Sequence, residues 1–415
     1  MIGILISAIK IIFLLGFLIF IHEGGHFLVA KLCKVKVNEF AIGFGPTIWK
    51  KQGNETKYAL RLIPLGGFVS MEGEVESSEQ EGSFSKASIP RRIAIVAAGA
   101  LVNIVFGLMV YFILMSSTGN YITNVIDSTV DNYAAQQVGI KQGDAIVEFN
   151  GNKVKNKYDL NKLMNNNNGE EIKLKINRND QIVEYTVKPT KQDIKSTGIY
   201  LKKDSKIIAV EPNSSAEKAG LKANDKIIKI NGENTNNDPY KVLELINSNT
   251  ENLNLEIERD KETLNIDLTP DNTSKYYLGV TFKKAENTFL NHIYYGLIET
   301  KTFGFSILEN LKQLFSGNVS VDQMMGPVGI SEAVAETNGF SEFIYLLALI
   351  SLSLGVTNLL PIPALDGGKI VILLIEAIRR KTLKEGTEMK IQLIGFSILI
   401  ALTIYITYND ILRIF

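Results

Sequence analysis

The sequence has a single cysteine, Cys33, among 415 residues. One cysteine cannot form a disulfide within the chain, so the fold depends on no internal disulfide in any compartment. The sequence also lacks an excess of charge, because 44 basic residues balance 44 acidic residues. Nucleic-acid-binding domains are typically basic, so the composition indicates no nucleic-acid partner. Histidine is scarce too, with three residues in all.

Long apolar runs are present at both ends of the chain, whereas the middle is rich in Asn, Lys, Asp and Glu. A bilayer core about 30 Å thick requires about 20 mostly apolar residues in a helix. Four stretches satisfy this requirement: 4–30, 93–115, 342–375 and 391–408. The first has no small-residue cleavage site and carries His and Glu in its second half. We therefore expect it to be retained as a span rather than removed as a signal peptide.

The positions of lysine and arginine predict the orientation of these spans. Basic residues lie between spans one and two and between spans three and four: Lys31, Lys34, Lys36, Lys86, Arg91, Arg92, Arg379, Arg380, Lys381, Lys384 and Lys390. By contrast, residues 116–135 and 321–340 contain none. Short loops rich in lysine and arginine stay in the cytosol. We therefore expect a multi-pass protein of the inner (plasma) membrane, with the insert 116–340 and both termini extracytoplasmic.

One segment of the insert occurs twice. The stretch "VGIKQGDAIVEFNG" (138–151) returns without a gap as "AGLKANDKIIKING" (219–232), 81 residues further on. Each copy combines a strand ending in Asn-Gly, a short helical stretch and two alternating strands. This pattern resembles the bacterial PDZ domain, so we expect PDZ domains at 116–203 and 204–284. They bind peptide tails as an added strand, or they act as spacers or a size filter; the sequence leaves both open.

The first apolar run contains "HEGGH". His22 and His26 are four residues apart, so on a helix they share one face, with Glu23 beside them. This is the H-E-x-x-H arrangement, in which two imidazoles bind zinc and the glutamate serves as base. Ionisable residues at the centre of a span cost about 2.5–3.5 kcal/mol each on insertion scales and tend to mark function. The expected depth of these residues in the membrane thus favours a metal site. The alternative is that the histidines only form hydrogen bonds between helices.

A catalytic zinc site needs a third protein ligand. His292 lies in a stretch, 287–315, that has the charge pattern of an amphipathic surface helix and is therefore a poor candidate. Asp366 in "NLLPIPALDGG" and Glu376 are the carboxylates set among apolar residues. The prolines and glycines around Asp366 predict a broken span, which membranes tolerate only inside protein or beside a wet cavity. Glu376 is next to arginines and is predicted to be interfacial.

Together, "HEGGH", "NLLPIPALDGG" and the tandem PDZ pattern resemble the site-2 protease family of intramembrane zinc metalloproteases, specifically the bacterial regulator-of-sigma-E protease type. The resemblance covers essentially the whole chain. It implies Zn²⁺ as cofactor, with His22, His26 and Asp366 as ligands and Glu23 as catalytic acid and base. It also implies a role for Asn358 in binding substrate or stabilising the reaction intermediate. Helix-to-helix hydrogen bonding is the alternative role for Asn358.

The resemblance further implies how a substrate is held. Residues 35–71 read as short strands around a Gln-Gly-Asn turn, and similar family members carry a membrane-entering β-hairpin here that pairs with a substrate strand. A surface hairpin without this role is the alternative. The following acidic run, 72–81, is predicted to be a solvated loop.

These features predict the fold class and the domains. We expect a polytopic α-helical membrane protein with four transmembrane helices, a membrane-associated β-hairpin and two inserted α+β PDZ domains. The expected domains are 1–115 with spans one and two, 116–203 and 204–284 for the PDZ copies, 285–340 as an amphipathic linker, and 341–415 with spans three and four.

The function expected from these features is an intramembrane zinc endopeptidase. It would cut transmembrane segments of membrane proteins, such as anti-sigma factors or remnant signal peptides. The expected partners are those substrates, peptide tails at the PDZ domains and the lipid bilayer. The alternative function is a catalytically silent scaffold that binds membrane-protein tails.

Overall fold

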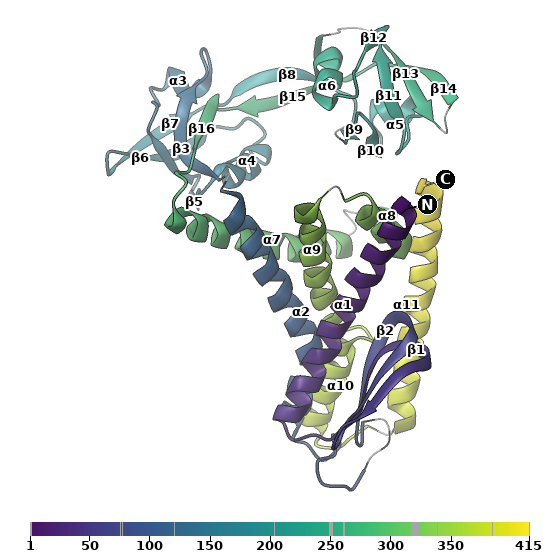
Figure 1. Ribbon diagram of the computed structural model, residues 1–415. Helices are drawn as coiled ribbons and strands as arrows, with labels where there is room; N and C mark the ends of the chain where they lie inside the picture. Colours follow the sequence, from purple (N-terminus) through teal and green to yellow (C-terminus); the bar gives the residue numbers. More distant parts are fainter. Residues whose placement is uncertain are drawn as a thin grey trace. The chain divides into compact units, whose positions relative to one another are not determined.

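The computed structural model contains two compact units (Figure 1). One unit comprises Met1–Gly119 with Asn287–Arg413, and the other comprises Asn120–Glu286. The structure describes residues 2–74, 76, 78–119, 121–202, 204–248, 252–259, 262–316, 324–337, 339–383 and 385–414. The first unit holds the long apolar runs, and the second holds the repeated segment.

The first unit is mostly helical. Its elements are α1 (Ile2–Leu32), β1 (Val37–Gln52), β2 (Lys57–Met71), α2 (Ile89–Thr118), α7 (Phe289–Phe315), α8 (Pro327–Ala335), α9 (Phe340–Asn358), α10 (Asp366–Arg379) and α11 (Glu385–Ile414). Among the described residues, four helices are long and apolar enough to cross a membrane: α1, α2, α9 and α11. They fall on the four predicted spans. The break expected in the third span is confirmed, because α9 ends at Asn358 and α10 begins at Asp366.

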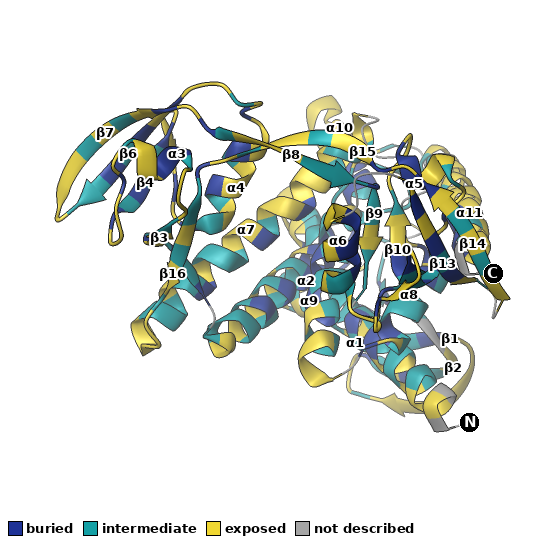
Figure 2. Cartoon of the chain, turned by 90° about the horizontal axis from the view of Figure 1, so that it is seen from above, coloured by how far each residue is buried: buried dark blue, intermediate teal, exposed yellow. Residues whose placement is uncertain are grey.

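Burial follows the pattern expected for helices in lipid. Figure 2 colours the chain by exposure, and α11 shows a largely exposed surface. That surface is apolar, with Leu393, Phe396 and Ile404 among its exposed side chains. A water-soluble helix would turn such residues inward, whereas lipid accepts them. The linker helix α7 is amphipathic as expected and buries Phe303 and Ile307. Part of the expected linker, 317–323, lies outside the described residues.

The strands β1 and β2 form the expected hairpin, but both are bent. Residues 39–42 of β1 pair with 67–70 of β2 on one side and with 57–60 of β2 on the other. Gly43, Gly45 and Gly66 have positive φ, which lets the strands turn back on themselves. The result is a small curled sheet in which the 67–71 segment forms one edge.

The second unit contains both repeated copies. Its elements are β3 (Ile122–Thr129), α3 (Ala134–Gln137), β4 (Ala145–Phe149), β5 (Asn152–Lys153), α4 (Lys157–Asn165), β6 (Ile172–Arg178), β7 (Gln181–Val187), β8 (Thr190–Ser196), β9 (Ile199–Leu201), β10 (Ile207–Val210), α5 (Ser215–Lys218), β11 (Lys226–Ile230), β12 (Glu233–Asn234), α6 (Pro239–Ser248), β13 (Leu253–Arg259), β14 (Glu262–Leu268), β15 (Asp271–Tyr277) and β16 (Val280–Lys284). The first copy has a sheet of order β16-β3-β4-β6-β7. The second copy has a sheet of order β12-β11-β13-β14 and a separate two-stranded sheet of β10 and β9.

The two copies exchange strands. The strand β16 follows the second copy in sequence, yet it pairs with β3 of the first copy, Val280 opposite Thr129. At the equivalent position of the repeat, β9 follows the first copy and pairs with β10 of the second, Ile199 opposite Val210. The pairing therefore differs from a division at 203/204, because β9 (199–201) pairs with the second copy and β16 (280–284) pairs with the first.

A two-stranded ribbon joins the exchanged segments. Strands β8 and β15 pair antiparallel along their whole length, and Asp193 lies opposite Ser274 at the centre. The Ser274 hydroxyl donates to the Asp193 carboxylate at 2.6 Å. These two residues occupy equivalent repeat positions, 81 apart, so the ribbon is symmetric about its own middle. The exchange is thus reciprocal.

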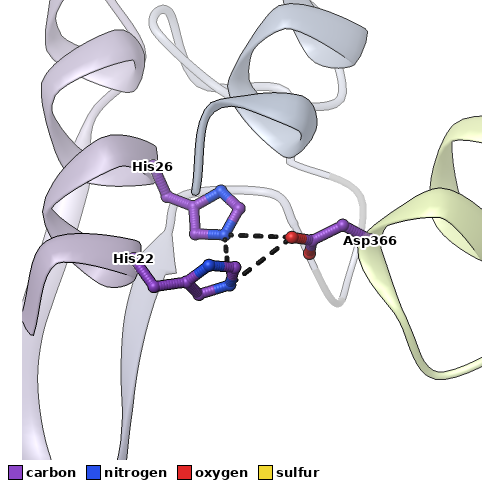
Figure 3. Close-up of side chains that lie close together, drawn as sticks. All are labelled: His22, His26 and Asp366. Atoms are coloured by element: carbon purple, nitrogen blue, oxygen red, sulfur yellow. Dashed lines mark hydrogen bonds and ion pairs between the residues drawn. The ribbon is translucent and has the colours of Figure 1, made fainter. Parts of the chain in front are cut away.

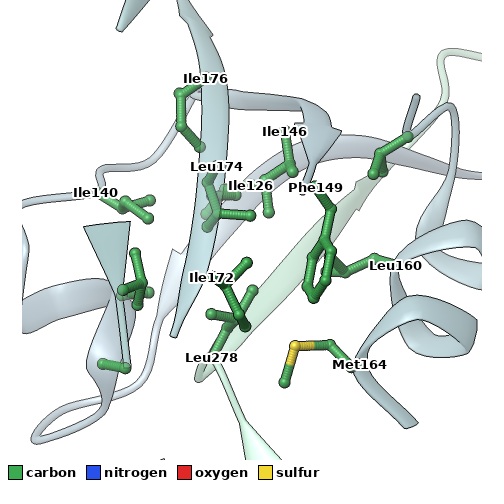
Figure 4. Packing of buried hydrophobic residues seen from close by; sticks show 14 residues of the cluster. Ile126, Ile140, Ile146, Phe149, Leu160, Met164, Ile172, Leu174, Ile176 and Leu278 are labelled. Atoms are coloured by element: carbon green, nitrogen blue, oxygen red, sulfur yellow. The ribbon is translucent and has the colours of Figure 1, made fainter. Parts of the chain in front are cut away.

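Leu278 provides a direct test of the exchange. Its side chain is buried in the core of the first copy, with Leu174, Ile172 and Phe149 (Figure 4). We expect Leu278→Ala to destabilise the first copy by about 2–5 kcal/mol, because it leaves a cavity in that core. Hydrogen exchange should accelerate at Ile172–Arg178 and stay unchanged at Leu253–Arg259. Faster exchange confined to the second copy would contradict the observed pairing.

Each copy also contains an ion pair between a buried aspartate and a partly exposed arginine. Arg178 donates to both carboxylate oxygens of Asp144, at 2.7 and 2.6 Å, and Arg259 does the same to Asp225. Burial alone would raise the pKa of Asp144, but hydrogen bonds from Arg178 and from the Lys141 backbone outweigh it and lower that pKa.

A lowered folded-state pKa stabilises the fold at neutral pH, and this contribution is lost as pH falls through that pKa. We expect Asp144→Asn to cost about 1.5–3 kcal/mol at pH 7, since it weakens the charged hydrogen bonds to the partly exposed Arg178. The difference from wild type should shrink below about pH 4. Urea denaturation of residues 120–286 at pH 7 and below about pH 4 measures the loss of stability and its dependence on pH. A pH-independent difference would contradict the role of the charge.

Candidate metal centre

The helix α1 places His22 and His26 on one face, as expected from their spacing. Their rings meet edge to face, with centroids 4.8 Å apart. The Nε2 atoms are 3.3 Å apart. Both side chains are only slightly exposed, at 14% and 12%.

Asp366 comes from the broken span. It is the first residue of α10, after a loop, 359–365, that contains Ala364 at φ +73°. A left-handed alanine is uncommon, and here its N–H donates to the Gln392 side chain of α11 at 2.7 Å. The loop backbone also packs closely against the first turn of α10. A Cβ added to Gly367 would lie 2.3 Å from Leu359 O. The loop therefore fixes where Asp366 points.

The three side chains converge on one point (Figure 3). Asp366 Oδ2 lies 3.4 Å from His22 Nε2 and 3.6 Å from His26 Nε2. These distances exceed ordinary hydrogen bonds. They match the edges of a tetrahedron around zinc, which are about 1.63 times the usual bond of about 2.0–2.2 Å, or about 3.3–3.6 Å. Asp366 Oδ2 is buried and has no hydrogen-bond partner. A cation held by all three ligands would satisfy it, so these residues fit zinc.

The helix α2 supports the two histidines. His26 Nδ1 lies 2.8 Å from Ile95 O, and a carbonyl can only accept, so Nδ1 carries the proton and leaves Nε2 free to bind a metal. The helices approach closely: a Cβ on Gly25 would lie 2.7 Å from Ala98 O, and one on Gly99 would lie 2.3 Å from His26 Nε2. Glycine at these two positions therefore makes room for the site.

Glu23 lies against the curled sheet. A Cβ on Gly67, in the edge segment of β2, would come within 3.0 Å of Glu23 Cγ. The acidic loop that follows β2 is also tied to the site, because Glu74 accepts from Lys369 of α10 at 2.7 Å. Glu74 is thus partly buried in an ion pair, in contrast to the solvated loop expected at 72–81.

Other residues named from the sequence lie elsewhere. Asn358 ends α9, across the 359–365 loop from Asp366, and is half-buried. His292 contacts Ser116 O and the Asn287 side chain. Glu376 is 3% exposed and accepts from Arg92 at 3.0 Å. Glu376, which was predicted to be interfacial, is thus enclosed by protein and paired with Arg92 of α2.

Sequence reasoning missed Gly99, Asn103 and Gln392. Asn103 is fully buried in α2, and its amide nitrogen lies 3.4 Å from His22 Nδ1. A polar residue inside an apolar run, such as Asn103 in the second span, is a signal from which this position could have been found. Gly99 carried no such signal, since small residues are common wherever membrane helices meet.

Comparisons with known proteins cover nearly the whole chain. The profile described as Peptidase family M50 matches residues 10–402. A "Regulator of sigma E protease" of Haemophilus influenzae is 33% identical, covering 96% of each chain. "Protease RseP" of Yersinia pestis is 31% identical over the full length of both. A Clostridium acetobutylicum protein, whose name describes a zinc metalloprotease, is 31% identical over 95% of this chain and 94% of its own. Among solved structures, the PDZ domain of HtrA3 with a phage-derived ligand covers 21% of this chain and 94% of its own, at 19% identity and a TM-score of 0.19.

Proposed function

The chain belongs to peptidase family M50 and is a zinc metalloprotease, and from this premise we propose that His22, His26 and Asp366 hold the zinc ion while Glu23 and Asn358 act on the substrate. The observation that carries the assignment is the set of ligand-atom distances, 3.3–3.6 Å, among residues set in apolar helices. Because the chain belongs to a peptidase family, we propose the protease function and not the alternative of a catalytically silent scaffold.

His22, His26 and Asp366 would hold zinc, which when bound would supply a Lewis acid that polarises the scissile carbonyl and acidifies water. Glu23 accepts the proton of the attacking water and passes it to the departing amine nitrogen. Asn358 donates a hydrogen bond to the oxyanion that develops on the carbonyl. The α1 and α10 backbones hold the reacting groups in place, and the surrounding apolar helices limit access of bulk water.

The curled sheet is proposed to present the substrate. A transmembrane helix hides its peptide bonds in its own hydrogen bonds, so a target must become extended before it is cut. The edge segment 67–71 borders Glu23 through Gly67 and can pair with an extended segment. Exposed apolar side chains on this sheet, Trp49, Leu62 and Ile63, suit contact with lipid.

The proposed substrates are membrane proteins whose spanning segments are cut in regulated intramembrane proteolysis, such as anti-sigma factors or remnant signal peptides. The names of the relatives support this class. The protein is proposed to lie in the inner membrane with residues 120–286 and both termini outside the cytoplasm. The paired copies then receive peptide tails or screen substrates by size.

Metal removal tests the proposal. The full chain is reconstituted in liposomes with a single-span substrate, and mass spectrometry locates the cut. We expect cleavage inside the spanning segment, loss of cleavage after chelation, and recovery with added zinc. Asp366→Asn should weaken zinc binding and cleavage together. Cleavage by protein that metal analysis shows to be zinc-free would overturn the assignment.

A further inference from the structure

We infer that Asn103 is a positioning residue for the metal centre: its side-chain oxygen accepts the Nδ1 proton of His22 and so leaves His22 Nε2 free to bind zinc. The inference rests on the proposed zinc site and assigns to α2 a hydrogen bond that sets the tautomer of one ligand.

The geometry restricts what Asn103 can contact. Its side chain is 0% exposed, in the middle of α2, and its amide group faces His22 Nδ1. The amide nitrogen lies 3.4 Å from that ring nitrogen, while the amide oxygen is buried and has no partner. Full burial excludes contact with substrate. The ring of His22 is therefore the polar group that the amide reaches.

The chemistry of the ring decides which amide atom belongs there. His22 Nε2 faces Asp366 and His26, so Nε2 is the metal-binding atom. A neutral imidazole that binds metal through Nε2 carries its proton on Nδ1, and Nδ1–H requires an acceptor. The amide nitrogen is a donor and cannot accept. Its oxygen can.

A rotation of the amide by 180° resolves the mismatch. The two ends of an asparagine amide are nearly isosteric, and their assignment follows the hydrogen-bond network. The rotation brings Oδ1 to Nδ1–H and places the amide NH2 group at the buried position that the oxygen had occupied. His22 then matches His26, whose Nδ1 lies 2.8 Å from Ile95 O. Both ligands are thus oriented from α2: His26 by the Ile95 carbonyl, and His22 by the Asn103 side chain together with a backbone hydrogen bond to Gly99.

The backbone of Asn103 has a separate contact that serves as a control. The Ser351 hydroxyl of α9 donates to Asn103 O at 2.9 Å, and Ser351 is fully buried. Ser351→Ala removes this helix-to-helix bond without changing the amide. A purely structural role for Asn103 would make the two positions behave alike.

The test combines zinc affinity with a direct reading of the tautomer. The full chain has three histidines, so ¹⁵N-histidine labelling gives three assignable rings. In zinc-free protein at about pH 8.5, we expect His22 to carry its proton on Nδ1. Asn103→Leu keeps the volume and removes the acceptor. It should shift His22 toward the Nε2–H form and weaken zinc binding about 10–100-fold.

The remaining variants decide between outcomes. Asn103→Asp retains an acceptor and should preserve both the tautomer and zinc binding, and Ser351→Ala should preserve them as well. Two results would overturn the inference. One is a proton on Nε2 of His22 in the wild type, which can be measured even if Asn103→Leu folds poorly. The other is unchanged zinc affinity in Asn103→Leu. A wild-type chain that binds no zinc would instead reject the proposed site itself.

Discussion

Glu23→Gln is expected to abolish cleavage while zinc stays bound. The substitution keeps the shape of the side chain and removes the carboxylate that is proposed to accept and return the proton. General acid and base catalysis contributes about 10²–10⁴-fold, so the rate should fall by at least that range. Glu23 is outside the ligand cluster of His22, His26 and Asp366, so the metal content should match wild type. Cleavage of a single-span substrate in liposomes and metal analysis of the same preparation measure the two quantities.

Glu74→Gln is the matched control for this prediction. Glu74 is a second glutamate beside the site, but its carboxylate pairs with Lys369. Loss of that ion pair should loosen the loop after β2 and reduce cleavage only modestly. If Glu23→Gln retained the wild-type rate, or if it lost zinc, Glu23 would have another role.

Gly99→Ala should disrupt the metal centre by sterics alone. The new methyl group would lie 2.3 Å from His26 Nε2 and 2.8 Å from His22 Cε1. His26 cannot simply swing away, because its Nδ1 is bound to Ile95 O. The ring must shift, and ligands displaced by a few tenths of an ångström bind zinc poorly. We expect zinc affinity to fall at least about 10-fold, with loss of cleavage, as measured by zinc competition and the liposome assay.

Gly24→Ala is the control for Gly99→Ala. A Cβ on Gly24 meets nothing within 4 Å, although Gly24 lies between Glu23 and Gly25 in the same helix. Alanine is also the better helix former, so the variant should fold and bind zinc as wild type does. Equal zinc affinity of Gly24→Ala and Gly99→Ala would show that the α1–α2 approach does not limit the site.

The sequence was informative where a chemical signal was local. "HEGGH" contains two proposed ligands one helical turn apart, and "PIPALDGG" breaks its own helix, so both could be located without knowledge of the fold. Their meeting could be inferred only from similar depth. The structure adds the long-range partners: Arg92 beside Glu376, Gln392 beside Ala364 and Lys369 beside Glu74. Such pairs have no characteristic spacing, since the fold decides which loops meet.

The strand exchange was hidden for a different reason. A repeat of 81 residues predicts two equivalent copies, but it is equally compatible with copies that close on themselves and with copies that trade their last strands. The strands at Ile199 and Val280 occupy equivalent positions, so the pattern of apolar residues fits either sheet. The boundary at 203/204 followed the order of the sequence, whereas the pairing follows the ribbon of β8 and β15.

This exchange changes how deletion experiments on the gene should be designed. Removing the codons for 204–284 would delete β16 along with the second copy, so the first copy would lose a strand of its sheet. Removing 116–203 would take β9 from the second copy in the same way. A phenotype from either truncation therefore reports damage to both copies, and single substitutions within one core are the means to separate their contributions.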